Sequence, residues 1–287
     1  MTRRLTSATT LFALLLTLVA AAPTSAQLVA AKDGPIVYGH HHVATKNPAA
    51  HLKFWADALG GAVIKFGANN VDVVKFQNVL IFFRDQAPTG GTRGTTVNHI
   101  GFSVPDLKPV IERVKAHGFQ MITRTEVAPT QEVKDDIAAI NPNVSIAFAL
   151  GPDDVKVELL QIKQSLPITL HHVHFFGQQN AEMQAWYAKV FGAKPRNGGA
   201  FPAADLPGVA LNFSPSPDPV VGTSGRSVDH IGFEVKNLEA FVKSLEAMGV
   251  KITVPFRNVP ALGLSIAFVQ DPWGTSIELT EGLDKIS

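Results

Sequence analysis

The sequence predicts an α+β fold made of four units, in each of which a strand and a helix are followed by three more strands. The main observation is an internal match: residues 229–250 (DHIGFEVKNLEAFVKSLEAMGV) align without a gap to residues 98–119 (NHIGFSVPDLKPVIERVKAHGF). A second match joins residues 170–193 to the stretch that begins at Gly39. In both pairs, an alternating run typical of a strand precedes apolar side chains at helical spacing. One strand–helix pattern therefore recurs four times along the chain.

The alternation in these strands separates two faces. In HIGFEV, the side chains of Ile231, Phe233 and Val235 share one face, and the helix that follows offers an apolar stripe to cover it. The stripe residues are Leu238, Phe241, Val242, Leu245 and Met248, and in the earlier copy Leu107, Val110, Ile111 and Val114. His230 and His99 are left on the opposite, concave face, where we expect a functional site.

Residues 1–26 have the layout of a secretory signal peptide. Arg3 and Arg4 precede an apolar run over 11–22, and small residues at 24–26 suit a cleavage site. The run is shorter than the ~20 residues that a membrane span needs. We therefore expect cleavage and a secreted or periplasmic mature protein, with an uncleaved membrane anchor as the alternative.

The composition of the remaining chain argues against several functions. Without the two arginines of residues 1–26, 23 of the 25 basic residues remain against 24 acidic ones, and they form no basic tract. Such a balance gives no electrostatic footprint for nucleic acid or an anionic membrane. The chain has no cysteine, which excludes disulfides, thiolate catalysis and zinc–sulfur sites. No later stretch is long and apolar enough to span a membrane.

The mature sequence divides into two similar predicted domains, 36–162 and 168–283, with a linker between them. Each contains two units, and the four units are 36–97, 98–162, 168–228 and 229–283. Because corresponding stretches match between the domains, the same architecture is expected in both.

Each unit is expected to open with a strand and a helix and to continue with three strands. In the first unit, the strand over 37–45 leads into a helix closed by a Gly-Gly pair, then AVIKF, VDVVKF and NVLIFF. In the second, the helix ends at Gly118, and strands are predicted for MITRT, SIAFAL and VKVELL, with a polar insertion over 126–143. In the later units, GVALNF (208–213) corresponds to NVLIFF, and SIAFVQDPWGTSIELTEG (265–282) corresponds to the stretch that begins with SIAFAL.

Histidine and glutamate recur at corresponding places in both domains. His172 and His230 begin the first strands of the third and fourth units, on the concave face. Glu278 lies on the same face of the last strand, TSIELTE. The matching residues of the first half are His40, His99 and Glu158.

Two neutral imidazoles and one carboxylate that converge bind a divalent ion and leave positions for water or substrate. The sequence therefore predicts sites for Fe, Mn, Ni or Zn. Each residue alone has an ordinary structural explanation, because a strand histidine is often only hydrogen-bonded and a lone glutamate is commonly solvated. Whether the units pair within each half, or the first with the fourth, stays open, since either pairing supplies two histidines and one glutamate.

Further histidines lie near these positions. His42 and His174 come two residues after His40 and His172, hence on the same face, and are candidate catalytic residues that donate a hydrogen bond or act as general acid or base. The alternative is a lining role only. His41 and His171 point to the other face and are expected to be structural, and Trp55, Trp186 and Tyr187 are expected in the core. His51 and His117 lie on predicted helices and are expected to be exposed or at the seam between helix and sheet.

With four such units and this His…His…Glu pattern, the chain resembles the vicinal oxygen chelate superfamily, which includes glyoxalase I, bleomycin-resistance proteins, fosfomycin-resistance enzymes and extradiol dioxygenases. The resemblance covers residues 36–283, and its strongest marks are HHVHFF…WYAKVFGA, DHIGFEV…LEAMGV and AFVQDPWGTSIEL. It implies paired βαβββ modules, each pair curling into a cup-shaped half-barrel around a metal. The ligands that it implies are His172, His230 and Glu278, and by the internal match His40, His99 and Glu158.

The chain departs from particular members of that superfamily. Extradiol dioxygenases carry an acid–base histidine and a tyrosine before the ligand glutamate, where this chain has Val259 and Phe268. Glyoxalase I-like enzymes supply a second glutamate from the last strand of the partner module, where this chain has Asn212 and Phe82. The resemblance therefore implies an exported metal-dependent enzyme for a small oxygen-chelating substrate, of lyase, isomerase or dioxygenase type. The alternatives are a non-catalytic binding protein of the bleomycin-resistance type and a duplicated chain with only one active cup.

Overall fold

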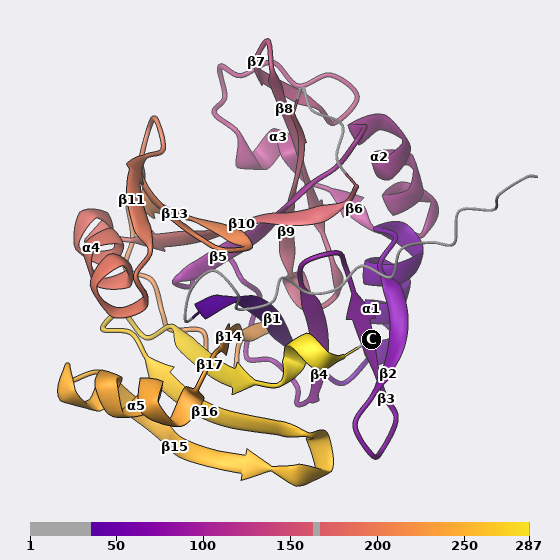
Figure 1. The fold of residues 1–287 in the computed structure, drawn as a ribbon. Helices are drawn as coiled ribbons and strands as arrows, with labels where there is room; N and C mark the ends of the chain where they lie inside the picture. Colours follow the sequence, from indigo (N-terminus) through magenta and orange to yellow (C-terminus); the bar gives the residue numbers. More distant parts are fainter. Residues whose placement is uncertain (1–35, 163–166, 287) are drawn as a thin grey trace, which may run out of the picture.

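The computed structural model describes residues 36–162 and 167–286, and the expected signal peptide, residues 1–26, lies outside them. Two large mixed sheets and the helices packed against them make up the fold, which confirms the predicted α+β class (Figure 1). One continuous core of buried side chains joins the helices to both sheets. In the described residues, no helix is long and apolar enough to cross a membrane.

The first sheet has eight strands in the order β15-β16-β17-β14-β1-β4-β3-β2. Its strands are β1 (Ile36–Thr45), β2 (Ala62–Phe66), β3 (Val71–Lys75), β4 (Leu80–Asp85), β14 (Val228–Val235), β15 (Lys251–Val259), β16 (Leu264–Gln270) and β17 (Ser276–Glu281). We call the curved surface that it forms cup A. It combines the first and fourth units of the sequence.

The second sheet has nine strands in the order β11-β12-β13-β10-β5-β9-β8-β6, with β7 paired to β8. Its strands are β5 (Val97–Ser103), β6 (Gln120–Met121), β7 (Ala138–Asn141), β8 (Val144–Leu150), β9 (Lys156–Ile162), β10 (Thr169–Gly177), β11 (Lys194–Asn197), β12 (Pro202–Leu206) and β13 (Val209–Pro215). We call its curved surface cup B. It combines the second and third units.

The two sheets therefore cross the halves of the sequence. At the centre of cup A, β1 runs antiparallel to β14, and at the centre of cup B, β5 runs antiparallel to β10 (Figure 1). Neither 36–162 nor 168–283 builds a sheet of its own. Of the two pairings that the sequence left open, the structure has the exchanged one.

The helices cover the convex backs of the sheets with their apolar stripes. They are α1 (Pro48–Leu52), which continues as a π-helix over Lys53–Ala58, α2 (Leu107–Ala116), α4 (Asn180–Phe191) and α5 (Leu238–Ala247). The four-residue α3 (Thr123–Glu126) has no apolar stripe and lies beside β8. The predicted stripe of α2 is fully buried, whereas Met248, placed at the end of the α5 stripe, is 38% exposed. The Asp106 carboxylate caps α2 by accepting from the Lys108 amide, and Gly192 ends α4 at φ +71.

The predicted strand MITRT (121–125) is wrong beyond its first residue. Only Met121 pairs in a strand, and the chain then turns into α3. The Phe148 amide donates to Thr123 Oγ1, and the Arg124 guanidinium donates to carbonyls of the turn that follows, among them that of Ala128. These local hydrogen bonds favour a curled backbone over a strand. The polar insertion that follows contains β7.

Candidate metal centres

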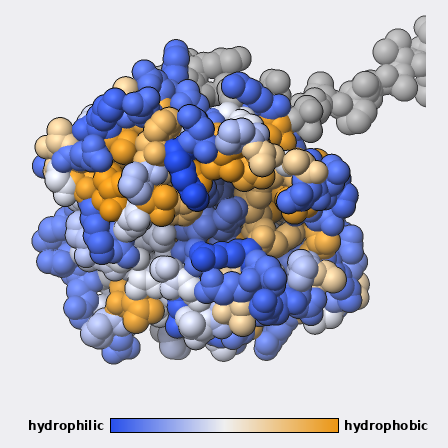
Figure 2. Space-filling model, turned by 90° about the horizontal axis from the view of Figure 1, so that it is seen from below, coloured by the Kyte–Doolittle hydropathy of each residue, from blue (hydrophilic) through white to orange (hydrophobic). Residues whose placement is uncertain are grey.

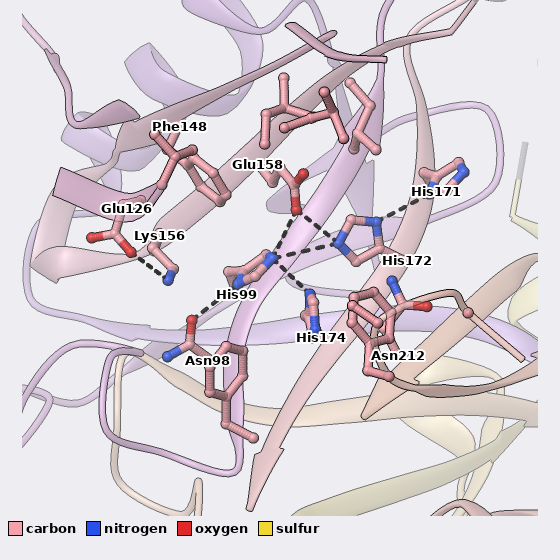
Figure 3. A pocket seen from close by; sticks show the side chains of 18 of the residues that line it. Asn98, His99, Glu126, Phe148, Lys156, Glu158, His171, His172, His174 and Asn212 are labelled. Atoms are coloured by element: carbon pink, nitrogen blue, oxygen red, sulfur yellow. Dashed lines mark hydrogen bonds and ion pairs between the residues drawn. The ribbon is translucent and has the colours of Figure 1, made fainter. Parts of the chain in front are cut away.

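Four side chains converge on the floor of cup B from three neighbouring strands. His99 comes from β5, Glu158 from β9, and His172 and His174 from β10. Glu158 Oε2 lies 2.9 Å from His99 Nε2 and 3.2 Å from His172 Nε2 (Figure 3). His99 Nε2 lies 3.5 Å from His172 Nε2 and 3.2 Å from His174 Nδ1. All four residues are buried.

Cup A contains a corresponding group built from the first and fourth units. Glu278 Oε2 lies 2.9 Å from His40 Nε2 and 3.0 Å from His230 Nε2. His42 is further away, with its Nδ1 3.8 Å from the same oxygen and its side chain 26% exposed. In both cups the candidate ligand atoms lie within 4.8 Å of one another.

The exchanged pairing regroups the residues expected from the sequence. The set His172, His230 and Glu278 does not assemble, because His172 lies in cup B and the other two in cup A. The same holds for the set of the first half, since His40 joins cup A while His99 and Glu158 join cup B. All six residues lie at a candidate centre, but with different partners.

A glycine of the partner strand makes room for one histidine of each cup. Gly101 of β5 stands opposite His172 in the strand pairing, and a Cβ at this position would lie 2.1 Å from His172 Cε1. Gly232 of β14 stands opposite His40, where a Cβ would lie 2.0 Å from Cε1. Sequence reasoning missed this role. The signal was the HIGF motif, whose glycine follows each first-strand histidine by two residues in the second and fourth units.

The far nitrogens of the candidate ligands meet different partners in the two cups. His230 Nδ1 lies 2.7 Å from Asp229 Oδ1, and Asp229 also accepts from Arg84 at 3.0 Å. In cup B the corresponding nitrogen of His99 lies 3.0 Å from the neutral Asn98 Oδ1. Partners of this kind fix the orientation of a metal-binding imidazole and tune its basicity, most strongly when they are carboxylates.

Burial and mutual contacts set the protonation of these groups. Burial alone would raise the pKa of the Glu158 carboxyl, but hydrogen bonds with His172 and His99 hold it well below its usual range. The same balance, with His230 and His40, lowers the pKa of Glu278. Burial lowers the pKa of His99 to about 4, despite the opposing effect of Glu158. In cup B, an ionised Glu158 beside a neutral His99 is the state that metal ligands require. In cup A, burial alone would lower the pKa of His230, but hydrogen bonds with Asp229 and Glu278 outweigh this effect and raise that pKa.

The residues present fit a divalent ion. Ligand bonds of about 2.1 Å, at angles between octahedral and tetrahedral, place neighbouring ligand atoms roughly 3.0 to 3.4 Å apart. In cup B, the candidate ligand atoms in contact are 2.9 to 3.5 Å apart. In cup A, Glu278 Oε2 lies 2.9 Å from His40 Nε2 and 3.0 Å from His230 Nε2. In addition, His40 Nδ1 is buried without a hydrogen-bond partner among the described residues, so its ring is held by packing and by the contact at Nε2.

Each group lies in a cavity, and the two cavities differ in lining. The cavity of cup B has a volume of about 680 Å³, and its wall includes Arg93, Glu126, Lys156 and Asn212. That of cup A measures about 470 Å³, and its wall includes Phe66, Phe82, Leu264 and Arg257. Figure 2 shows the face seen from below, which is hollowed, polar inside the hollow and flanked by hydrophobic side chains.

The position from which a second glutamate was expected is neutral in both cups. Asn212 of β13 stands beside His174 in the strand pairing, and Phe82 of β4 stands beside His42. Both side chains line the cavities. Of the acidic side chains described, one per cup therefore belongs to the histidine group.

Some of the remaining histidines lie where the sequence predicts them and others do not. His41 is buried away from the centre, with its Nδ1 2.9 Å from Tyr38 Oη. His171 was expected on the opposite face, but it lines the cup B cavity and its Nδ1 lies 3.0 Å from His172 Nδ1. The cause is an irregularity in β10 between Leu170 and His172, which breaks the alternation. His51 is fully buried, and its Nε2 lies 3.0 Å from Asp153 Oδ2.

Comparison with known proteins places part of the chain in a family. Residues 169–279 match the model of the Glyoxalase/Bleomycin resistance protein/Dioxygenase superfamily. These residues belong to this superfamily. The resemblance inferred from the sequence is thereby confirmed for the third and fourth units. No protein with a curated function matches the sequence.

Solved structures show a similar fold over most of the chain. Glyoxalase I from Zea mays superposes with a TM-score of 0.64 at 15% identity, covering 88% of this chain and 94% of that one. A putative dioxygenase from Bacillus subtilis superposes with a TM-score of 0.60 at 11% identity, covering 85% of this chain and 84% of that one. At such identities the likeness concerns the fold.

Proposed function

We propose that this protein is a divalent-metal-dependent enzyme that acts on a small substrate through two neighbouring oxygen atoms. The observation that carries the proposal is the convergence of two imidazoles and one carboxylate on the floor of a cavity, in each of two cups. Buried histidine–glutamate groups of this kind are costly unless they serve a ligand.

In cup A the metal would be held by His40, His230 and Glu278, and in cup B by His99, His172 and Glu158. Three protein ligands leave up to three of six octahedral positions free, so two substrate oxygens fit beside the protein ligands. A divalent ion at these positions polarises bound oxygen atoms and stabilises negative charge that develops on the substrate.

The third histidine has a different role in each cup in this proposal. His174 Nδ1 lies 3.2 Å from His99 Nε2, a separation that suits a fourth ligand of the same ion. His42 lies 3.8 Å from Glu278 and is partly exposed to the cavity, so it is placed to carry a proton between substrate and solvent. A proton-transfer role was expected for both histidines. We propose it for His42 alone, because His174 is better placed as a ligand.

The reaction class that we propose is a lyase, isomerase or dioxygenase step that passes through negative charge on a metal-facing oxygen. Where a glyoxalase-type second glutamate would abstract a proton, the chain has Asn212 and Phe82, neither of which is a base. In cup A this task falls to His42, whose ring lies 4.3 Å from that of His230.

Metal analysis of the purified mature protein tests the proposal. We expect about two equivalents per chain of Fe, Mn, Ni or Zn after reconstitution, and about one after His230→Ala. A wild-type protein that binds none of these ions would overturn it and would favour a non-catalytic small-molecule binding protein. Export is also proposed, from residues 1–26, and an intact N-terminus in protein from expressing cells would contradict it.

A further inference from the structure

A buried lysine stands beside the centre of cup B. Lys156 lies two residues before Glu158 in β9, so both side chains share the concave face and their Cα atoms lie about 6–7 Å apart. The Lys156 side chain is only 5% exposed, yet it lines the cavity next to His99 (Figure 3). A cation removed from water is costly, so its retention here points to an electrostatic task.

The hydrogen-bonding capacity of this ammonium group is largely unused by the described residues. Lys156 Nζ lies 2.7 Å from Glu126 Oε2, which is the one acceptor that the described residues offer it. A lysine ammonium has three N–H donors, so two remain for a ligand. The rings of Phe148 and Phe176 lie 5.5 and 5.9 Å from Nζ, within the range of a cation–π contact.

A second cation shares the same carboxylate. Arg93 Nη1 lies 3.4 Å from Glu126 Oε1 and also lines the cavity. Glu126 thus stands between two positive groups, and one positive charge is left over in this corner of the wall. The Arg93 side chain is 49% exposed, so solvent screens its charge. A negatively charged ligand atom placed there would therefore be attracted mainly by the buried Lys156.

Cup A lacks this arrangement at the corresponding positions. The alignment of residues 155–158 with 275–278 puts Ser276 where cup B has Lys156. Asp229 stands where cup B has the neutral Asn98. The cationic side chain in the wall of cup A, Arg257, is exposed to solvent. Lys75 of β3 is buried as well, but it does not line the cup A cavity. Among the described residues, a buried cation in the cavity wall is therefore a property of cup B.

We infer that cup B selects an acidic substrate, whose carboxylate binds Lys156 while its two chelating oxygens face His99, His172 and Glu158. Glu126 offsets one positive charge of the pair Lys156 and Arg93, so this acid-binding corner keeps one positive charge. Cup A, whose described lining has no buried cation, takes a substrate without such a group. The inference rests on the proposed function, since it places the acid group relative to chelating oxygens.

Binding of two matched probes to the metal-loaded protein tests the inference. 2-Oxoglutarate and 2-oxopentanoate present the same chelating 2-oxo acid, but only the first has a terminal carboxylate. In a His230→Ala background, which leaves cup B as the loaded site, we expect 2-oxoglutarate to bind about ten-fold more tightly or better. In a His99→Ala background, where cup A is the loaded site, we expect no such preference.

Three variants in the His230→Ala background then assign the preference to the lysine. Lys156→Ser, which copies cup A, should abolish it without changing the affinity for 2-oxopentanoate, and Lys156→Arg should retain it. Glu126→Gln should strengthen 2-oxoglutarate binding, because it removes a competing carboxylate while keeping the shape. Equal affinities for both probes in cup B, or equal losses for both in Lys156→Ser, would overturn the inference. Failure of the protein to bind metal would instead overturn the proposed function.

Discussion

Gly101→Ala is expected to empty cup B of metal while leaving cup A loaded. The new Cβ would lie 2.1 Å from His172 Cε1 and 2.4 Å from Nδ1, whereas carbon atoms in contact are about 3.5–4.0 Å apart. The His172 ring must therefore move by roughly 1.5 Å. Metal–ligand distances tolerate only about 0.2 Å, so His172 is lost as a ligand. The overpacking should also lower the free energy of unfolding by about 1–3 kcal/mol.

The assay is metal content per chain after reconstitution and desalting, together with thermal unfolding to show that the variant is folded. Gly101→Ala should retain about one equivalent, and the matched variant Gly232→Ala should do the same by displacing His40 from cup A instead. The double variant should retain none. If Gly101→Ala keeps two equivalents with unchanged affinity, the close approach of Gly101 to His172 does not position a ligand and the reasoning fails.

Three further predictions concern the third histidine of each cup, the partner of His230, and the pH dependence of stability. His174→Ala should weaken cobalt binding in cup B by at least about 100-fold, as competition with a chelator would measure, whereas His42→Ala should leave cobalt affinity in cup A nearly unchanged. Asp229→Asn should weaken the metal of cup A about 10- to 100-fold, since Asp229 orients His230, and an unchanged affinity would contradict this role. Burial lowers the pKa of His51 in the folded state, so below about pH 6.5 the unfolded state takes up a proton first. The free energy of unfolding of the wild type should therefore fall from about pH 7.5 to 5. The fall should be less steep in His51→Gln, which lacks this titrating group.

Much of the fold follows from local patterns. Alternation in HIGFEV and the apolar stripe of α5 depend only on side-chain periodicity, so the sequence predicts both the strand–helix order and the face on which His230 lies. The six candidate ligands were predicted for the same reason. Where a local irregularity breaks the period, as in β10 before His172, the prediction for His171 failed.

The grouping of the ligands could not be predicted from periodicity. Alternation defines the face of a strand but not its neighbour, and β1 has equivalent candidate partners in β5 and β14, whose sequences are similar. Whether β1 pairs with β5 or with β14 depends on contacts between whole units, which side-chain alternation does not encode. Gly101 and Gly232 carry no chemistry of their own, so their role becomes visible only once the partner strand is known.

The most direct test of the account is the metal content of two double variants. The structure predicts that His172→Ala with His230→Ala removes one ligand from each cup and leaves no tightly bound metal, whereas His99→Ala with His172→Ala disables cup B alone and leaves one equivalent per chain. The reverse result, with one equivalent left in the first variant and none in the second, would show that the centres assemble within the halves of the sequence and would contradict the account.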